Sequence, residues 1–249
     1  MMCSCCFAMH HKKIVSCLLK PNAQMKHLIR ILLLIVKWPI AMLSLFTLPF
    51  VAMECCTLLT QQFETMPLLF WAVVAGGLAV GWLFNPRFRA TRLLTTMEHE
   101  LIHVLLAWLS FLRVEKLEAQ SDGNGLATIE APANWLVFLG PYFIPLAMFF
   151  YAFILHALPL EDSSIQLGCA FILGYEATGN LREIHPQQTD FLQAGVLFTI
   201  LFLPTAILVS YTGAMTYMVH GELIQCWSQT GSLMVDGFDS AWRWAQQFM

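Results

Sequence analysis

The sequence predicts an all-α polytopic membrane protein with about five to six transmembrane helices and one short β-hairpin. Of its 249 residues, 58% are hydrophobic and only 12% are charged, whereas a soluble domain carries about 25% charged residues. Several apolar segments reach the roughly 20 residues that an α-helix needs to cross a hydrocarbon core. One polar segment between two of them alternates around a Gly-rich turn, which is typical of a hairpin.

Three regions are expected along the chain: a basic tail over residues 1–30, a membrane-embedded domain over 31–221, and a polar, amphipathic tail over 222–249. Met25 opens MKHLIRILLLIVKW, which is typical of the start of a membrane protein, so residues 1–24 are interpreted as an extension without a role in the fold. No second cluster at ligand spacing accompanies the cysteines and histidines of that extension, and a lipidated or featureless tail is favoured over a metal site there (Cys3, Cys5, Cys6, His10 and His11).

Five apolar segments are the predicted spans, and a sixth is marginal. The first span follows a basic amphipathic lead-in, and the second contains three glycines that would permit close helix packing. The marginal segment, 164–180, is short and contains Glu176. The five spans are residues 38–59, residues 67–84, a helix that starts near Ala90, residues 135–158 with kinks expected at Pro141 and Pro145, and residues 191–217.

The charges of the loops orient the chain by the positive-inside rule. Basic residues before the first span place the N-terminus in the cytoplasm, and Arg87, Arg89 and Arg92 return the chain there before the third span. The mainly acidic segment 113–135 and the acidic C-terminal tail are expected outside. The predicted hairpin lies in segment 113–135, around the sequence SDGNG.

The third span contains ionisable residues within a helix-length apolar run, TTMEHELIHVLLAWLSFL (95–112). His99, Glu100 and His103 form an H-E-x-x-H motif. Two histidines four residues apart face the same way on a helix and can bind one metal ion, and the glutamate can take a proton from a water on that metal. The five-residue pattern alone is weak, but ionisable groups inside a membrane helix are costly and persist mainly where they function. The alternative is that the histidines hydrogen-bond to neighbouring helices.

A catalytic zinc site needs a third protein ligand at a similar depth. The polar patch 174–191 is the best source, and Asp190 at the start of the last span is the preferred ligand. His99 lies about 10 Å along the helix from Arg92, so Asp190 reaches the same layer if 164–185 is re-entrant or broken. An unbroken span there would place Asp190 on the opposite side. The alternatives within the patch are Glu176, Asn180, Glu183 and His185.

These residues resemble a known family. EHELIHVLLAWL, the hairpin segment, WLVFLGPYFIPL and the later Asp190 look like the M50-type, site-2-protease-like membrane zinc metallopeptidases, and most closely their M50B-like branch. The resemblance covers roughly residues 90–215. It implies Zn²⁺ on His99 and His103, Glu100 as general base, an aspartate from a later helix as third ligand, and a hairpin edge that holds an extended substrate.

The chain departs from the family pattern at two points. Ile102 occupies the fourth motif position, where the family commonly has glycine, and the Asn-Pro-x-x-Asp-Gly signature is absent because Phe191 follows Asp190. A relation to prenyl-protein proteases, the other membrane class with this motif, is weaker. Those enzymes have an E-x-x-x-D pattern, and in this chain Asn180 stands where the pattern that starts at Glu176 would have aspartate.

The first functional hypothesis is therefore an intramembrane zinc metalloprotease that hydrolyses peptide bonds of membrane-associated polypeptides in a bacterial cytoplasmic (inner) membrane. The alternative is a catalytically inactive M50-like protein that acts as a binding or chaperone module, which the departures favour. A transporter is less favoured, because it would need further intramembrane charges along a path and few are present. The net charge of −3 and the lack of a basic stripe give no indication of nucleic-acid binding. The expected partners are a polypeptide substrate and the lipid bilayer.

Overall fold

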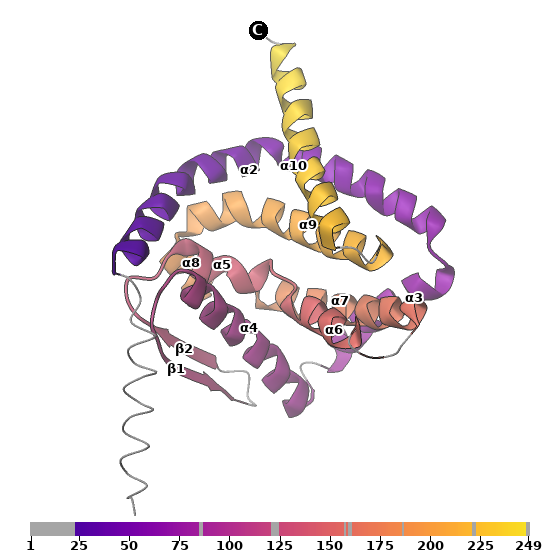
Figure 1. Ribbon diagram of the computed structural model, residues 1–249, viewed down its shortest axis with the longest axis horizontal. Coiled ribbons are helices and arrows are strands. Elements are labelled where there is room, and N and C mark those ends of the chain that lie inside the picture. The colour runs from indigo at the N-terminus through magenta and orange to yellow at the C-terminus, as the bar shows by residue number, and fades with distance from the viewer. Residues whose placement is uncertain are drawn as a thin grey trace, which may run out of the picture.

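The computed structural model describes residues 23–84, 87–120, 125–156, 158, 161–185, 187–220 and 223–247, and within them the chain is mainly helical (Figure 1). The cysteine- and histidine-containing extension lies outside the described residues. In chain order the elements are α2 (Ala23–Thr65), α3 (Leu68–Phe84), α4 (Arg89–Leu109), β1 (Val114–Ala119), β2 (Gly125–Ile129), α5 (Trp135–Leu139), the 3₁₀ turn η1 (Gly140–Tyr142), α6 (Leu146–His156), α7 (Asp162–Glu183), α8 (Thr189–Ala194), α9 (Val196–His220) and α10 (Leu223–Gln246).

Two of the described helices, α2 and α9, are by themselves long and apolar enough to cross a membrane. They run in the same direction, because Ser44 of α2 accepts a hydrogen bond from Thr205 of α9 and Cys55 lies against Thr212 further along both. Two bent pairs, α3 with α4 (108°) and α5–η1 with α6 (69°), raise the number of candidate spans among the described residues to as many as four. Helix α2 has 43 residues and extends beyond the expected span 38–59 at both ends.

Helices α3 and α7 form the closest helix pair, and they also run in the same direction. A Cβ atom added at Gly77 would lie 2.1 Å from the carbonyl oxygen of Phe171, and one added at Gly81 would lie 2.9 Å from the carbonyl oxygen of Tyr175. Gly174 makes the matching approach from α7 to Val74. The prediction that the glycines of the second span permit close packing is therefore confirmed for Gly77 and Gly81, whereas Gly76 faces open space.

The expectation that residues 164–185 form a broken helix is wrong, because α7 is one unbroken helix of 22 residues. Helix α7 is, however, not among the described helices that are long and apolar enough to cross a membrane. Glu176 does not interrupt it, since its carboxylate accepts hydrogen bonds from the backbone N–H groups of Ala147 and Met148 at 3.2 and 3.1 Å. These two N–H groups belong to the first turn of α6, where the backbone N–H groups have no carbonyl acceptors within the helix. A buried carboxylate with such partners is compatible with a continuous helix.

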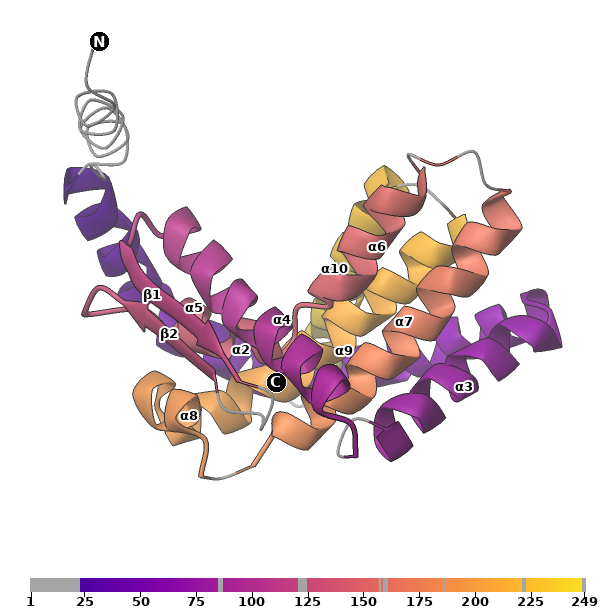
Figure 2. The ribbon, with the colours of Figure 1, turned by 90° about the horizontal axis from the view of Figure 1, so that it is seen from below.

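The segment predicted as a single span, 135–158, is instead divided into two helices. Helix α5 ends after five residues, η1 follows, and α6 starts again after Pro145. Helix α6 then runs alongside α7 in the opposite direction (Figure 2). Helix α6 leads the chain away from α4, and α7 leads it back. An unbroken α7 therefore ends near His99, whereas the sequence alone predicts that an unbroken helix there places Asp190 on the opposite side of the membrane.

The predicted hairpin is confirmed: β1 and β2 pair antiparallel directly after α4. The turn residues 121–124 lie outside the described residues. At the open end of the hairpin, the N–H of Glu130 donates to the carbonyl of Arg113. The Glu130 side chain also forms an ion pair with Lys26 in the first turns of α2, at 2.5 Å. The hairpin is thereby connected to the start of α2, 104 residues earlier in the chain.

Two buried clusters flank the region where α4, α5 and α8 meet. One joins α3, α6, α7 and α9 around Phe70, Met148 and Leu173. The other joins α2, α5, η1, α8 and α9, and Tyr142 and Phe198 are its largest fully buried side chains. A third cluster contains α4 itself, where Ile102, Leu106 and Ala107 pack with Leu112 and Val137 and hold the helix that contains the motif.

Candidate metal centre

The H-E-x-x-H motif lies in the middle of α4, a helix of 21 residues with a strongly amphipathic pattern. His99 and His103 are one turn apart on the same face, and their ring centroids are 4.8 Å apart. His103 and Glu100 are buried, with 6% and 8% of their surface exposed. The helix therefore presents two imidazoles side by side in a largely buried position, as the spacing predicts.

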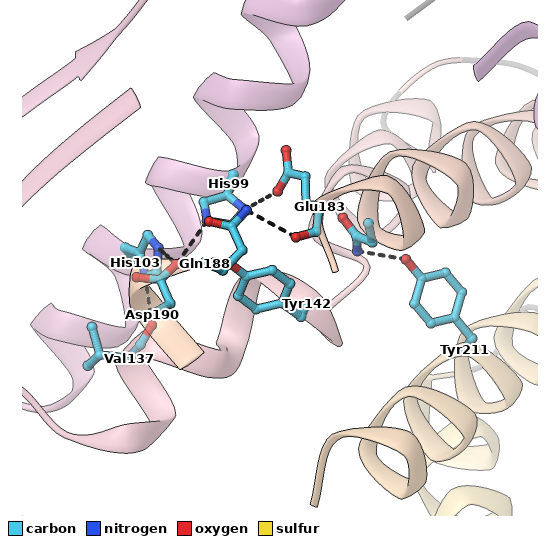
Figure 3. Close-up of polar contacts among 9 residues, drawn as sticks. His99, His103, Val137, Tyr142, Glu183, Gln188, Asp190 and Tyr211 are labelled. Carbon is cyan, nitrogen blue, oxygen red and sulfur yellow. Dashed lines mark hydrogen bonds and ion pairs between the residues drawn. The ribbon is translucent and has the colours of Figure 1, made fainter. Parts of the chain in front are cut away.

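Asp190 joins the two histidines from α8, 87 residues after His103 in the chain (Figure 3). One of its oxygens, Oδ2, lies 3.5 Å from Nε2 of His99 and 3.4 Å from Nε2 of His103. The three potential ligand atoms of this group lie within 4.8 Å of one another. A metal ion bound by all three would be held by two imidazole nitrogens and one carboxylate oxygen.

The arrangement of hydrogen bonds around this group fits a metal ion. Nδ1 of His103 donates to the carbonyl of Val137 at 2.7 Å, which leaves Nε2 as the nitrogen with a free lone pair on the side of Asp190. Nδ1 of His99 contacts the carboxylate of Glu183, so its Nε2 also faces Asp190. Two histidines and one carboxylate, each histidine oriented through its other nitrogen, form a donor set typical of catalytic zinc.

Three of the four alternative third ligands lie elsewhere. Glu176 bonds to the first turn of α6, Asn180 donates to the hydroxyl of Tyr211 at 2.7 Å, and Nδ1 of His185 accepts from the backbone of Gln187. Glu183 is the exception because it contacts His99, but from the side of Nδ1 and not from the side of Asp190. Of the candidates, Asp190 is the one that faces both histidines.

Glu100 lies next to the hairpin. Its carboxylate lies near the backbone N–H of Ala127 in β2. A Cβ atom added at Gly125 would lie 2.4 Å from Oε1 of Glu100 and 2.6 Å from the side chain of Thr96. Any side chain at position 125 would therefore displace Glu100, and the glycine allows β2 to approach α4 closely.

A cavity of about 420 Å³ opens between α4, β2 and α8. His99, Glu100, His103 and Asp190 form its polar wall, and β2 with the segment that follows it forms much of the opposite wall. The candidate metal ligands and the candidate general base thus line the same cavity, which is large enough to hold water molecules. A polypeptide strand lying along β2 would pass directly over them.

Ile102, which replaces the glycine common in the resembling enzymes, points away from this cavity. It is 2% exposed and packs in a cluster with Leu106 and Val137. A Cβ atom added at Gly140 would lie 3.3 Å from Ile102 and 2.0 Å from Leu106. The glycine that permits close packing is therefore on η1 in this chain, and the isoleucine fills space without touching the candidate ligands.

Sequence reasoning did not identify Val137, Tyr142 or Ala127 as parts of the site. Tyr142 donates its hydroxyl to Oδ2 of Asp190 at 2.9 Å, and Val137 and Ala127 contribute backbone groups to His103 and Glu100. Backbone contacts leave no mark in a sequence. Tyr142 did offer a signal, since a tyrosine between two prolines in an apolar run needs a partner for its hydroxyl.

Comparison with known proteins agrees with this geometry. The family model of Peptidase M50B-like proteins matches residues 69–216, which is more than half of the chain and includes the motif, the hairpin and Asp190. This match assigns the chain to the class of M50 membrane metallopeptidases, and together with the apolar helices it identifies an integral membrane protein. Within that class the chain belongs to the Peptidase M50B-like family, which confirms the predicted resemblance. No curated protein and no solved structure matched the chain.

Proposed function

We propose that this protein is an intramembrane zinc metalloendopeptidase that hydrolyses peptide bonds of membrane-associated polypeptides. The observation that supports this most is the convergence of His99, His103 and Asp190 within 4.8 Å beside Glu100, in the wall of a cavity. Two histidines and a carboxylate leave a fourth coordination position open, as hydrolytic zinc sites require. We assign the enzyme to the bacterial cytoplasmic membrane.

Each polar residue of the cavity has one role in this proposal. His99, His103 and Asp190 hold the zinc ion, which supplies a Lewis acid that polarises the scissile carbonyl and acidifies a neighbouring water. Glu100 accepts the proton of the attacking water and donates it to the leaving amine. A bound substrate strand would cover the cavity, so that the charges that develop on it interact more strongly with these residues.

The substrate is expected to bind as an extended strand along β2. A helical peptide hides its carbonyls in its own hydrogen bonds, so cleavage inside the membrane requires local unwinding. Strand β1 pairs along one edge of β2, and residues of β2 line the cavity, so the other edge of β2 is expected to offer backbone groups to a third strand. Strand addition of this kind provides main-chain hydrogen bonds that replace those of the unwound helix.

Metal content tests the proposal. We expect about one zinc per chain in detergent-purified protein, lost in His99→Ala and in Asp190→Ala and retained in Glu100→Gln. His185→Ala is the matched control, because His185 contacts Gln187 and not the cluster. Glu100→Gln should hydrolyse fluorescein-labelled casein at least about 100-fold more slowly than wild type, since it lacks the base.

Two results would contradict the proposal in different ways. Wild type without zinc, under conditions that load a control metalloprotein, rules out a zinc enzyme. Wild type that binds zinc normally but hydrolyses casein no faster than Glu100→Gln does would leave the alternative, a metal-containing binding or chaperone module.

A further inference from the structure

Each of the three candidate ligands is held by one group from a different segment. Val137 of α5 accepts from His103, Glu183 of α7 contacts His99, and Tyr142 of η1 donates to Asp190 (Figure 3). Partners of this kind normally set the orientation of metal ligands, and their loss typically weakens metal binding. Tyr142 stands out among the three because it touches two of the ligands.

Tyr142 contacts Asp190 with its hydroxyl and His99 with its ring. The hydroxyl lies 2.9 Å from Oδ2 of Asp190, the same oxygen that faces Nε2 of both histidines. The ring meets the imidazole of His99 edge-on, with centroids 5.2 Å apart and planes at 85°. One side chain therefore restricts both the rotation of the carboxylate and the tilt of one imidazole.

The side chain of Tyr142 is itself rigidly held. It is 1% exposed, its ring packs on Phe191 with a centroid distance of 4.6 Å, and it does not line the cavity. A substrate in the cavity cannot reach it. Its effect on the reaction must therefore pass through Asp190 and His99.

We propose that Tyr142 is a positioning residue of the metal centre, whose hydroxyl fixes Asp190 in the orientation that completes the site. This inference rests on the proposed zinc site. The torsion that turns a carboxylate about its last bond has broad preferences, and without the hydroxyl Asp190 would lose the hydrogen bond that holds Oδ2 on the side of the two histidines. The carboxylate of Asp190 is then already oriented for metal binding in the metal-free protein.

A purely structural explanation makes a different prediction. A buried tyrosine hydroxyl needs an acceptor, and Asp190 would serve that need without any effect on metal binding. Tyr211 provides the comparison, because its hydroxyl accepts a hydrogen bond from Asn180 at 2.7 Å but lies away from the ligands (Figure 3). Removing either hydroxyl deletes one hydrogen bond, but only the hydrogen bond of Tyr142 involves a candidate metal ligand.

The test compares Tyr142→Phe with Tyr211→Phe and wild type, each stripped of metal and titrated with zinc against a chromophoric chelator. We expect Tyr142→Phe to bind zinc about 10- to 100-fold more weakly than wild type, and Tyr211→Phe to bind it as wild type does. The visible absorption of the Co²⁺-substituted proteins should differ between Tyr142→Phe and wild type, because the carboxylate coordinates differently. Neither measurement depends on peptidase activity.

Three further outcomes decide the matter. Zinc affinity and Co²⁺ spectrum identical to wild type in Tyr142→Phe would overturn the inference while leaving the zinc site intact. Wild type that binds no zinc overturns the proposed function and the inference together. If Tyr142→Phe does not accumulate as folded protein, Phe191→Leu removes the ring that holds Tyr142 in place. Zinc affinity should then fall by about threefold to tenfold, because the hydroxyl no longer holds Asp190 firmly; unchanged affinity overturns the inference.

Discussion

The seam between α3 and α7 and the region around the candidate metal centre are built in opposite ways (Figure 2). The seam consists of two unbroken helices of 17 and 22 residues whose backbones touch at Gly77, Gly81 and Gly174. Around the centre, apart from the end of α7 that carries Glu183, the elements that accompany α4 are at most six residues long: β1, β2, α5, η1 and α8. Sterics fix the first region, and polar contacts between short segments fix the second.

The difference shows how a membrane domain can be rigid and still contain a polar site. Long helices satisfy their own backbone groups and need only close packing. Short elements leave backbone groups unpaired, and in a membrane these are tolerated only where protein or a cavity receives them. Here the carbonyl of Val137 accepts a hydrogen bond from His103, and the backbone N–H of Ala127 lies near the carboxylate of Glu100. The irregular backbone thus supplies contacts that an unbroken helix could not.

The largest expected effect comes from adding one methyl group to the seam. Gly77→Ala places a Cβ atom 2.1 Å from a backbone carbonyl, and backbone cannot move aside cheaply, so we expect a loss of about 3 kcal/mol or more in the free energy of unfolding. Zinc affinity of the protein that folds should remain that of wild type. Unfolding in detergent and the chelator titration measure the two quantities.

The neighbouring glycine is the control for this prediction. A Cβ atom added at Gly76 would have nothing within 4 Å among the described residues, so Gly76→Ala should be neutral or stabilise the helix by up to about 1 kcal/mol. Equal destabilisation by the two alanines would show that the seam does not depend on close approach at Gly77.

The second prediction applies the same methyl group to the region of the centre. In Gly140→Ala the new Cβ meets the end of the Leu106 side chain at 2.0 Å, which can rotate away, so the cost should be smaller, about 1–2 kcal/mol. The part of the clash that Leu106 does not relieve should displace η1 and with it Tyr142, so zinc affinity should fall about tenfold. The double variant with Leu106→Ala tests the cause, since relief of the clash should give a coupling of about 1 kcal/mol. Strictly additive losses would exclude this contact as the origin.

Local spacing explains what the sequence could predict about the site. His99 and His103 are one turn apart, and an α-helix places them together whatever the rest of the chain does. The position of Asp190 at the start of the last apolar segment predicts its approach, and the structure brings it to the histidines. The roles of these residues as metal ligands remain predictions that the zinc titration tests.

Contacts between distant segments explain what could not be predicted. Residues 135–158 are apolar almost throughout, so hydropathy predicts one span, and the prolines mark a kink without giving its size. The carboxylate of Glu176 suggested a broken helix because its partners, the N–H groups of Ala147 and Met148, exist only once that span has divided. The path of α6 and α7, and with it the position of Tyr142, follows from this one break.

The smallest expected effect concerns the ion pair between Lys26 and Glu130 at the open end of the hairpin. The Lys26 ammonium holds the pKa of Glu130 below its ordinary value of 4.5, so the ionised pair stabilises the folded state above that pH, and the contribution is lost as the pH falls through the lowered pKa. Both side chains are partly exposed, 22% and 38%, which limits the contribution to less than about 1 kcal/mol.

Lys26→Met should therefore lower the melting temperature slightly at about pH 7 and by less at acid pH, because Glu130 becomes protonated as the pH falls through its lowered pKa. Lys116→Met is the matched control, because Lys116 pairs with Glu118 on the same strand and connects no two elements; it should have no effect at either pH. A loss in Lys26→Met that is equal at both pH values would mean that the lysine stem packs against the hairpin and that its charge contributes nothing. A pH-dependent loss would instead show that the hairpin, which carries the proposed substrate edge, is attached to α2 by an interaction far weaker than the seam between α3 and α7.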